Sequence, residues 1–573
     1  MSEPTSREPG GESLRRMPKR RARGTAALLV VAALLVAACT STPPPTGQQQ
    51  SGEIDTNGAI TTNAGGEPDT IDPQKESFVN EVAQTMMVFE GLMTLDAKSL
   101  KPIPAAAKED PKVSADGLTY TFTLRDGLKY SDGSPLTAKD FAYGWTRLCD
   151  PATAGDYAFT GYIIAGCEAW NTLVPGKATP AELKAAKDKV GIKVNGDKEI
   201  SFTLVEPAPY FPSIAGIWVG VPSRESDVTK GGDRWTEPST FIGNGPFKLT
   251  EWKHNDKLVF ERNDNYRTPA KLKKWTKVMI NDGAVAFAAY RGNELDFYGV
   301  AAEDLRTVEG DPELKSQAVD VGGSCTNTYL FNSKKPPFTD QKVRQAFAKS
   351  FDRDDYIKNV QKIGLPALSF IPPGRPGYDP QDAFQKYDPA AAKALLQSSS
   401  FFGKPELNNL KFTYATSPRG KTRVEWAQQQ WKTNLGLDVA LDPVDSTTLA
   451  QLTKRAETNP QFSFLGWCED YPDPQDWLST VFRSNSTVLK TGYANPDFDK
   501  LTSDADRERD PVKRLELYQK ASRLLSQDAP AAFLYYASAK YLKKPWVKGV
   551  TDSTLDFEYG IYRITDIYVT KKS

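Results

Sequence analysis

The sequence of 573 residues is poor in histidine and has no excess of charge. His254 is its only histidine, so zinc sites built from several histidines are excluded and a Ser-His-Asp triad would have one candidate base. The 72 Lys and Arg residues balance 72 Asp and Glu residues. Proteins that bind nucleic acid through charge usually carry a basic excess or stripe, so we expect no nucleic-acid partner.

Catalytic motifs are also missing. The sequence contains neither G-x-S-x-G nor the glycine-rich loops G-x-G-x-x-G and G-x-x-x-x-G-K-[ST], and a single histidine rules out H-E-x-x-H. A hydrolase that uses a pair of carboxylates stays formally open, but the sequence singles out no pair. We therefore expect no enzymatic activity, no cofactor and no metal site.

The amino terminus has the features of a bacterial lipoprotein signal. Residues 1–24 hold seven Arg and Lys residues, and the apolar run 25–38 that follows has fourteen residues, too few to span a membrane as a stable helix. The run ends in V-A-A-C, which resembles a lipobox. We predict a signal peptide at 1–38, lipidation of Cys39 and anchoring to the extracytoplasmic face of the cell membrane. The alternative is an apolar stretch with a chance cysteine.

The segment after this signal has the composition of a linker. Residues 39–64 are rich in Thr, Pro, Gly, Gln and Ser and hold few apolar side chains. Such a segment cannot bury enough surface to fold. We predict a flexible tether that holds a globular body away from the membrane.

Four further cysteines fit an exported protein. An even number of cysteines outside the cytoplasm is compatible with two disulfides, although four cysteines allow three pairings. We expect a local bond between Cys149 and Cys167 and a long-range bond between Cys325 and Cys468. The alternative is four buried free thiols.

Strand and helix patterns alternate along the rest of the chain. Residues 118–124 alternate apolar and Thr side chains with the period of a half-buried strand, and residues 200–204 do the same. Thr137 and Asp140 have the spacing of a helix-opening capping box. After Asp340, the apolar side chains of 343–351 recur at helical spacing. These patterns predict an α/β chain of more than one lobe.

Several motifs, in a constant order from about residue 66 to the C-terminus, carry a family resemblance. Residues 66–73 read G-E-P-D-T-I-D-P, and residues 243–247 read G-N-G-P-F. The other matching blocks are 89–92, 102–107, 120–141, 261–266, 291–296 and 337–346. In these blocks the chain resembles the extracellular solute-binding proteins of the peptide/nickel ABC importer family, family 5.

This resemblance implies a fold. Members have a periplasmic-binding-protein-like α/β fold with mixed sheets, in which two lobes built from three subdomains close on a ligand about a hinge. The resemblance places lobe I at 65–92, 218–324 and 540–573, the small subdomain II at 93–217, and lobe III at 325–539.

It also implies site residues, because 466–471 read G-W-C-E-D-Y, as in the oligopeptide-binding members. There the aspartate matching Asp470 pairs with the α-ammonium group of the peptide, and the cysteines matching Cys325 and Cys468 form a disulfide. Tyr157 matches a tyrosine that closes over the amino end of the ligand. Backbone contacts are implied for Trp467, Cys468, Glu76, Ser77, Phe78 and Val79.

The chain departs from that pattern at the far end of the cleft. Phe464, Gln361 and Gly420 stand where oligopeptide-binding members have basic residues or histidine for the peptide C-terminus. Nearby basic residues could substitute or could be solvated surface charges: Lys362, Arg419, Lys421 and Arg455. No peptide length is therefore predicted.

Together these features predict a lipid-anchored, monomeric solute-binding protein of an ABC importer, which binds oligopeptides through their backbone and free amine. Its expected partners are an oligopeptide, a membrane permease with cytoplasmic ATPases, and the membrane through the lipid anchor. One alternative is another solute, such as a nickel chelate, haem or a sugar. The other is a lipoprotein without a transport role, acting as a peptide sensor or a chaperone-like binder.

Overall fold

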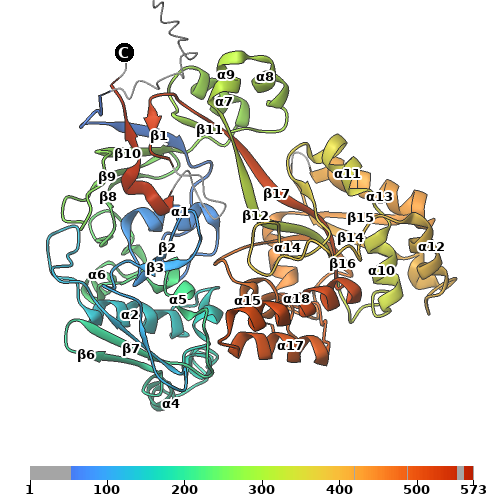
Figure 1. Cartoon of the computed structure of the whole chain (residues 1–573), viewed down its shortest axis with the longest axis horizontal. Helices are drawn as coiled ribbons and strands as arrows, with labels where there is room; N and C mark the ends of the chain where they lie inside the picture. Colours follow the sequence, from blue (N-terminus) through green and yellow to red (C-terminus); the bar gives the residue numbers. More distant parts are fainter. Residues whose placement is uncertain (1–52, 418–419, 487, 551–560, 572–573) are drawn as a thin grey trace, which may run out of the picture. The chain divides into compact units, whose positions relative to one another are not determined.

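The structure is a computed structural model that describes residues 53–571 apart from 418–419, 487 and 551–560. The predicted signal peptide, the lipidation site Cys39, most of the predicted tether and Arg419 lie outside the described residues. The described part is a mixed α/β structure with several sheets, as the sequence patterns predict (Figure 1).

The first sheet contains four strands in the order β1-β10-β9-β8. Its strands are β1 (Ala59–Asn63), β8 (Phe247–Lys253), β9 (Lys257–Arg262) and β10 (Lys274–Val278). β1 runs parallel to β10, and the other neighbours are antiparallel. Near this sheet lie α1 (Val79–Val88), α6 (Glu225–Gly231), β2 (Met93–Leu95) and β3 (Pro102–Pro104). The helices α7 (Gly283–Arg291), α8 (Leu305–Gly310) and α9 (Pro312–Gln317) form a separate apolar cluster with Leu542.

β1 corrects the predicted end of the tether, because the sheet already includes residues 59–63. Ile60 and Thr62 of this strand are buried at 1% and 0% exposure. The indole N–H of Trp275 donates to the hydroxyl of Thr62 at 2.9 Å. Composition was misleading here because a single buried apolar side chain, two β-branched threonines and a partner strand suffice for a short strand.

The second sheet is antiparallel, in the order β4-β5-β7-β6. Its strands are β4 (Lys112–Val113), β5 (Thr119–Thr123), β6 (Ile192–Asn195) and β7 (Glu199–Thr203), with helices α2 (Ala138–Cys149), α3 (Cys167–Asn171), α4 (Pro180–Lys187) and α5 (Phe211–Ile214) nearby. The predicted alternation is confirmed, since Tyr120 and Phe122 point into the core. The predicted capping box is confirmed too, with the Thr137 N–H donating to Asp140 at 2.8 Å.

The third sheet has seven strands and carries most of the C-terminal half. Its strands are β11 (Phe297–Gly299), β12 (Ala318–Phe331), β13 (Leu365–Pro366), β14 (Leu410–Ala415), β15 (Val439–Val444), β16 (Phe462–Cys468) and β17 (Ala531–Lys543). β14 is parallel to β15 and β16, whereas β12 is antiparallel to both β16 and β17. The helices here are α10 (Gln341–Lys349), α11 (Arg353–Asp355), α12 (Pro389–Gln397), α13 (Gly420–Leu435), α14 (Ser446–Thr453), α15 (Pro474–Trp477), α16 (Ser479–Phe482), α17 (Pro496–Arg507) and α18 (Pro511–Asp528). β18 (Val547–Lys548) pairs with β19 (Tyr568–Val569).

β12 and β17 are long paired strands that run through the predicted lobe boundaries at 325 and 539 (Figure 1). Their register shifts between Gly322 and Thr326. A Cβ on Gly323 would lie 1.6 Å from the carbonyl oxygen of Ala537, so only glycine fits there. The boundaries themselves stay a prediction.

Both predicted disulfides are confirmed. Cys149 at the end of α2 is bonded to Cys167 at the start of α3. Cys325 on β12 is bonded to Cys468 on β16, where the two residues are direct cross-strand partners. No helix in the described ranges is long and apolar enough to cross a membrane.

Removing the long-range disulfide should destabilise the protein more than removing the local one. Loop-closure entropy predicts a loss of about 5 kcal/mol for Cys325→Ser/Cys468→Ser and about 3 kcal/mol for Cys149→Ser/Cys167→Ser, because the closed loops differ in length. The sequence separations are 143 and 18 residues. Urea unfolding of both double variants measures the difference. A larger loss for the local pair would contradict the expectation.

Candidate binding site

Three carboxylates gather directly after β16. Glu469, Asp470 and Asp476 are buried at 1%, 5% and 0% exposure. β16 is held in place by its pairing with β12, which continues as the Glu469 N–H donates to the carbonyl of Ser324 at 2.8 Å. Asp473 then caps α15 by accepting from the Gln475 N–H at 2.9 Å, and this tight turn brings Asp476 back to Asp470.

Asp470 has one carboxylate oxygen without a partner. Its Oδ1 accepts from the Tyr157 hydroxyl at 3.3 Å, whereas its Oδ2 is buried without a hydrogen bond. Burial raises the pKa of Asp470 to about 8; the Tyr157 hydrogen bond opposes the shift, and the nearby Glu469 charge adds to it. An ionised Asp470 therefore needs a cation from outside the described part of the chain.

Asp476 accepts a hydrogen bond from the backbone of Asp470 and, like Asp470, has one buried carboxylate oxygen without a hydrogen bond. Its Oδ2 accepts from the indole N–H of Trp467 and from the backbone N–H of Asp470, both at 3.2 Å. Its Oδ1 is buried without a hydrogen bond. Burial, with the charges of Asp470 and Glu469, raises the pKa of Asp476 well above its usual range.

Glu469, by contrast, already has its cation. The Arg375 Nε lies 2.7 Å from its Oε2, and both side chains are almost fully buried. The indole N–H of Trp477 donates to Glu469 Oε1 at 3.2 Å. Burial raises the pKa of Glu469 to about 7 against the opposing effect of Arg375, but the short contact favours an ion pair.

The opposite side of the site is made by Tyr157, which belongs to the loop after α2. Its ring packs against Trp218 and Phe159, with centroids 5.1 Å away in both cases. Burial raises the pKa of the Tyr157 phenol well above its usual range, so the hydroxyl stays protonated and donates. The structure thus brings together Tyr157 and Asp470, the two residues that the resemblance implies for the amino end of the ligand, and their roles toward a ligand stay a prediction.

The loop that carries Tyr157 lies directly against residues 74–76. A Cβ on Gly155 would lie 1.9 Å from the carbonyl oxygen of Gln74, so glycine is required for this approach. The Gln74 side chain donates to the carbonyl of Val219 at 3.3 Å and accepts from Ser223 at 3.0 Å. Glu76 is fully buried and accepts from the Thr85 hydroxyl at 2.8 Å, and its burial raises its pKa well above the usual range.

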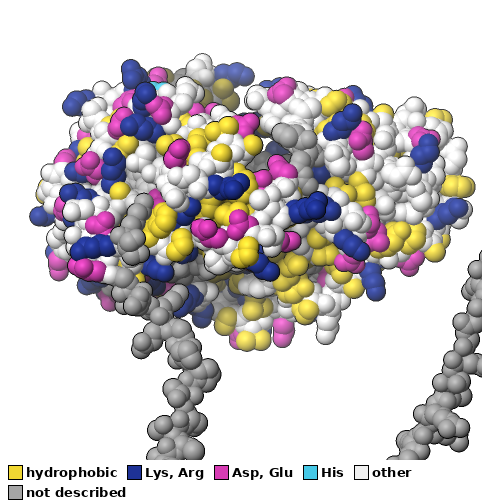
Figure 2. All heavy atoms as spheres, turned by 90° about the horizontal axis from the view of Figure 1, so that it is seen from above, with side chains coloured by type: hydrophobic (Ala, Val, Ile, Leu, Met, Phe, Trp, Pro, Cys, Tyr) yellow, Lys and Arg dark blue, Asp and Glu magenta, His cyan; other side chains and the backbone are white. Residues whose placement is uncertain are grey.

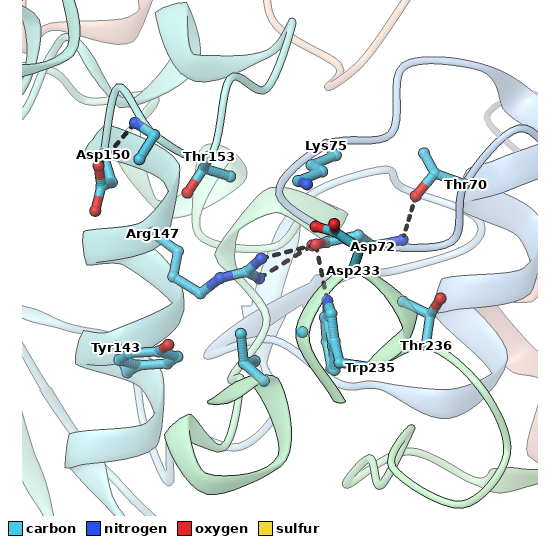
Figure 3. Close-up of a pocket in the computed structure, with 13 residues that line it drawn as sticks. Thr70, Asp72, Lys75, Tyr143, Arg147, Asp150, Thr153, Asp233, Trp235 and Thr236 are labelled. Atoms are coloured by element: carbon cyan, nitrogen blue, oxygen red, sulfur yellow. Dashed lines mark hydrogen bonds and ion pairs between the residues drawn. The ribbon is translucent and has the colours of Figure 1, made fainter. Parts of the chain in front are cut away.

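A buried ion pair fixes the segment that contains residues 74–76 to α2. Two guanidinium nitrogens of Arg147 contact the two Asp72 oxygens at 3.0 and 2.7 Å, and the indole N–H of Trp235 donates to Asp72 at 2.8 Å (Figure 3). The pair borders a pocket of about 300 Å³, which Lys75 and Tyr143 also line. Asp72 and Arg147 therefore help to position residues 74–79.

Ser77, Phe78 and Val79, for which the resemblance implies backbone contacts with the ligand, lie at the start of α1. The backbone N–H groups of Ser77 and Phe78 donate to the Glu81 carboxylate at 2.8 and 2.9 Å, so these donors are already occupied. The Phe78 and Val79 side chains are 58% and 46% exposed, unusual for such apolar residues. Their role in binding stays a prediction.

One edge of β16 is open beside Asp470. Its pairing with β14 covers only Phe412–Phe462 and Thr413–Ser463, whereas its pairing with β12 extends to Cys468. Within the described residues, 464–468 therefore have a strand neighbour on one side only. Trp467 and Cys468 lie in this stretch, and an extended ligand could pair with the free edge.

The model of the "Bacterial extracellular solute-binding proteins, family 5 Middle" matches residues 101–487. The chain belongs to this family. It is 31% identical to the oligopeptide-binding protein OppA of Bacillus subtilis over 517 residues, which cover 87% of this chain and 91% of the relative. It is 33% identical to the periplasmic oligopeptide-binding protein OppA of Salmonella typhimurium over 539 residues, covering 89% and 92%. Both relatives are named as oligopeptide-binding proteins.

Solved structures of this family agree with the fold. The murein tripeptide binding protein MppA of Escherichia coli matches with a TM-score of 0.77 and 28% identity, over 91% of this chain and all of the other. Haemophilus influenzae OppA in complex with the peptide RPPGFSPFR matches with a TM-score of 0.74 and 28% identity over the same shares. The predicted periplasmic-binding-protein-like fold is confirmed.

The family resemblance did not predict Asp476 as a residue of the site. An acid two residues after an Asp-Pro pair reads as an exposed first-turn residue of a helix, which complements the helix dipole. Only the turn of 471–474 places it inside the site. The basic residues named near the far end are less informative: Lys362 donates to the carbonyl of Lys358, and Lys421 lies 3.7 Å from Glu425. Gln361 does have a buried Oε1 without a hydrogen bond.

Breaking the Asp72–Arg147 pair should destabilise this family 5 protein. Arg147→Met leaves Asp72 buried without its cation, which typically costs about 3–5 kcal/mol. The matched control is Lys184→Met, which removes one partner of an exposed pair with Asp188 and should cost less than about 0.5 kcal/mol. Thermal unfolding compares the two variants. Equal unfolding temperatures of the two variants would show that the Asp72–Arg147 pair does not stabilise the fold.

Proposed function

We propose that the chain is a lipid-anchored, extracytoplasmic solute-binding protein of an ABC importer that binds oligopeptides through their backbone and free N-terminal amine. The observation that carries this proposal is the buried Asp470 Oδ2, which has no hydrogen bond and no described cation. The matched relatives support it by name, since they bind oligopeptides, dipeptides and a murein tripeptide.

The α-ammonium group of a peptide would supply the cationic hydrogen-bond donor that Asp470 lacks. It brings one positive charge and three N–H donors, and a charge-assisted bond in a dry site is roughly twice as strong as a neutral one. The Tyr157 hydroxyl holds the other oxygen of the carboxylate. This pairing selects an amine but ignores side chains, as a receptor for many peptides requires.

The open edge of β16 supplies the second half of the proposal. A peptide whose amine sits at Asp470 could run alongside 464–468 and pair with their backbone groups as an added strand. Such pairing is independent of sequence because it uses only N–H and C=O groups. Phe78 and Val79, exposed on the first-lobe side, would then contact side chains of the ligand.

Transport requires two further proposals. Lobe I (65–92, 218–324 and 540–573, extended to include β1), subdomain II (93–217) and lobe III (325–539) would close on the ligand, with β12 and β17 as the hinge. The ligand stabilises the closed form only through contacts made on both sides, here Tyr157 and Asp470. The monomeric closed form would then deliver peptide to a permease driven by cytoplasmic ATPases.

The free-amine requirement is directly testable. Asp470→Asn should weaken binding of tetra-alanine by roughly 30-fold to several thousand-fold, because loss of one partner of a buried charge pair costs about 2–5 kcal/mol. N-acetylated tetra-alanine should bind the unaltered protein as weakly. Isothermal titration calorimetry measures both, with Asp438→Asn, an exposed acid paired with Lys432, as the control. Equally tight binding of the free and acetylated peptides would contradict the free-amine requirement, and binding of neither peptide would favour another solute.

The anchor has its own test. In the native host, the full chain should fractionate with membranes, and Cys39→Ser should release it or block its maturation because the lipidated thiol is lost. Mass spectrometry of the mature N-terminus provides the readout. An unmodified Cys39 in the wild-type protein would contradict the anchor without affecting the peptide site.

A further inference from the structure

The proposed amine site contains two buried carboxylates where one charge would suffice. Asp470 Oδ2 and Asp476 Oδ1 are both buried without a hydrogen bond. The two side chains are linked, because the Asp470 backbone N–H donates to Asp476 Oδ2 at 3.2 Å. Two like charges this near in a dry site cannot both be ionised without a cation, so the pair must hold at least one proton.

The surrounding charged groups are already neutralised by each other. Glu469 is paired with Arg375 at 2.7 Å. Asp473 is paired with Arg514 through two contacts of 2.7 Å. The remaining titratable neighbours of the pair are the buried phenols of Tyr157 and Tyr471, which act as neutral groups. Among the described residues, neither Asp470 nor Asp476 takes part in an ion pair with Lys, Arg or His.

We propose that Asp470 and Asp476 act as one proton-holding pair, and that a peptide enters the site by exchanging its ammonium group for a proton of this pair. This inference rests on the proposed function and deepens it. In the exchange, the peptide arrives as R–NH3⁺, Asp470 passes from COOH to COO⁻, one proton leaves to solvent, and no covalent bond of the peptide changes. Asp476 keeps its proton in both states and acts as a positioning residue, because its Oδ2 accepts the backbone N–H of Asp470.

A protonated pair explains how the site without ligand avoids a buried charge that has no partner. Burial raises the pKa of Asp470 to about 8, so near pH 6.5 the empty site is mostly neutral. A neutral site costs little to desolvate, whereas an isolated buried carboxylate would cost several kcal/mol. A bound ammonium reverses the balance, because it lowers the pKa of Asp470 and makes the charged form the stable one.

The sign of the pH dependence follows from this exchange. Below the Asp470 pKa, binding releases a proton, so affinity should rise about tenfold per pH unit between pH 5.5 and 7.5. The gain should end near pH 8, where the site is already ionised. At higher pH affinity should fall, since a peptide α-amine itself loses its proton with a pKa of about 7.7–8.0.

Proton release can be measured without altering the protein. Tetra-alanine is titrated into the protein at pH 6.5 in phosphate, ACES and imidazole buffers, whose ionisation enthalpies differ. The slope of the apparent binding enthalpy against the buffer enthalpy gives the number of protons released, expected at about one per peptide. A slope of zero with tight peptide binding would overturn this inference and leave the proposed function intact. If tetra-alanine does not bind at all, the proposed function itself fails.

Substitutions of the two acids show which of them releases the proton. Asp470→Asn removes the releasing acid, so its residual binding of tetra-alanine should release no proton and should not rise with pH between 5.5 and 7.5. Asp476→Asn puts a neutral amide where Asp476 keeps its proton, so each bound peptide should still release about one proton. Asp438→Asn is the matched surface control and should keep the wild-type slope of affinity against pH. If Asp476→Asn does not fold, Trp467→Phe, which removes the indole donor to Asp476, should likewise keep the released proton. Loss of proton release in Asp476→Asn, or its persistence in Asp470→Asn, would contradict the exchange.

Discussion

The site depends on a carboxylate that the fold buries without a cation. Water would stabilise an exposed Asp470 charge, but at 5% exposure that stabilisation is mostly lost. The protein supplies one hydrogen bond from Tyr157 and leaves Oδ2 open. Neighbouring acids show that this is selective, because Glu469 and Asp473 each have an arginine. In the proposed function, the ammonium group of a peptide supplies the cation for Asp470.

Covalent and hydrogen-bonded contacts hold the chain in place on both sides of this carboxylate. The disulfide and strand pairing between β12 and β16 hold the residues before Asp470, and the cap of α15 holds those after it. On the other side, the Asp72–Arg147 pair and the close approach of Gly155 to Gln74 hold the loop of Tyr157. Two separate frameworks thus meet at one hydrogen bond, which is the geometry expected of a site that closes around its ligand.

The sequence predicted features that depend on local pattern or on a specific motif. The strand at 118–124, the capping box at Thr137 and both disulfides are of this kind. It did not predict β1, because a Thr-rich strand owes its stability to its neighbour rather than to its own hydrophobicity. It also missed Asp476, whose burial depends on a tight turn and on Trp467 from β16. Both features depend on tertiary contacts, which local sequence patterns do not show.

A crystal structure of the protein with bound tetra-alanine at pH 7.5 tests the central claim most directly. The account predicts that the terminal nitrogen of the peptide lies within hydrogen-bond distance of Asp470 Oδ2, about 2.7–2.9 Å for a charge-assisted bond. It also predicts that the peptide backbone runs beside 464–468. A peptide bound in the reverse direction, or with its amine away from Asp470, would contradict it.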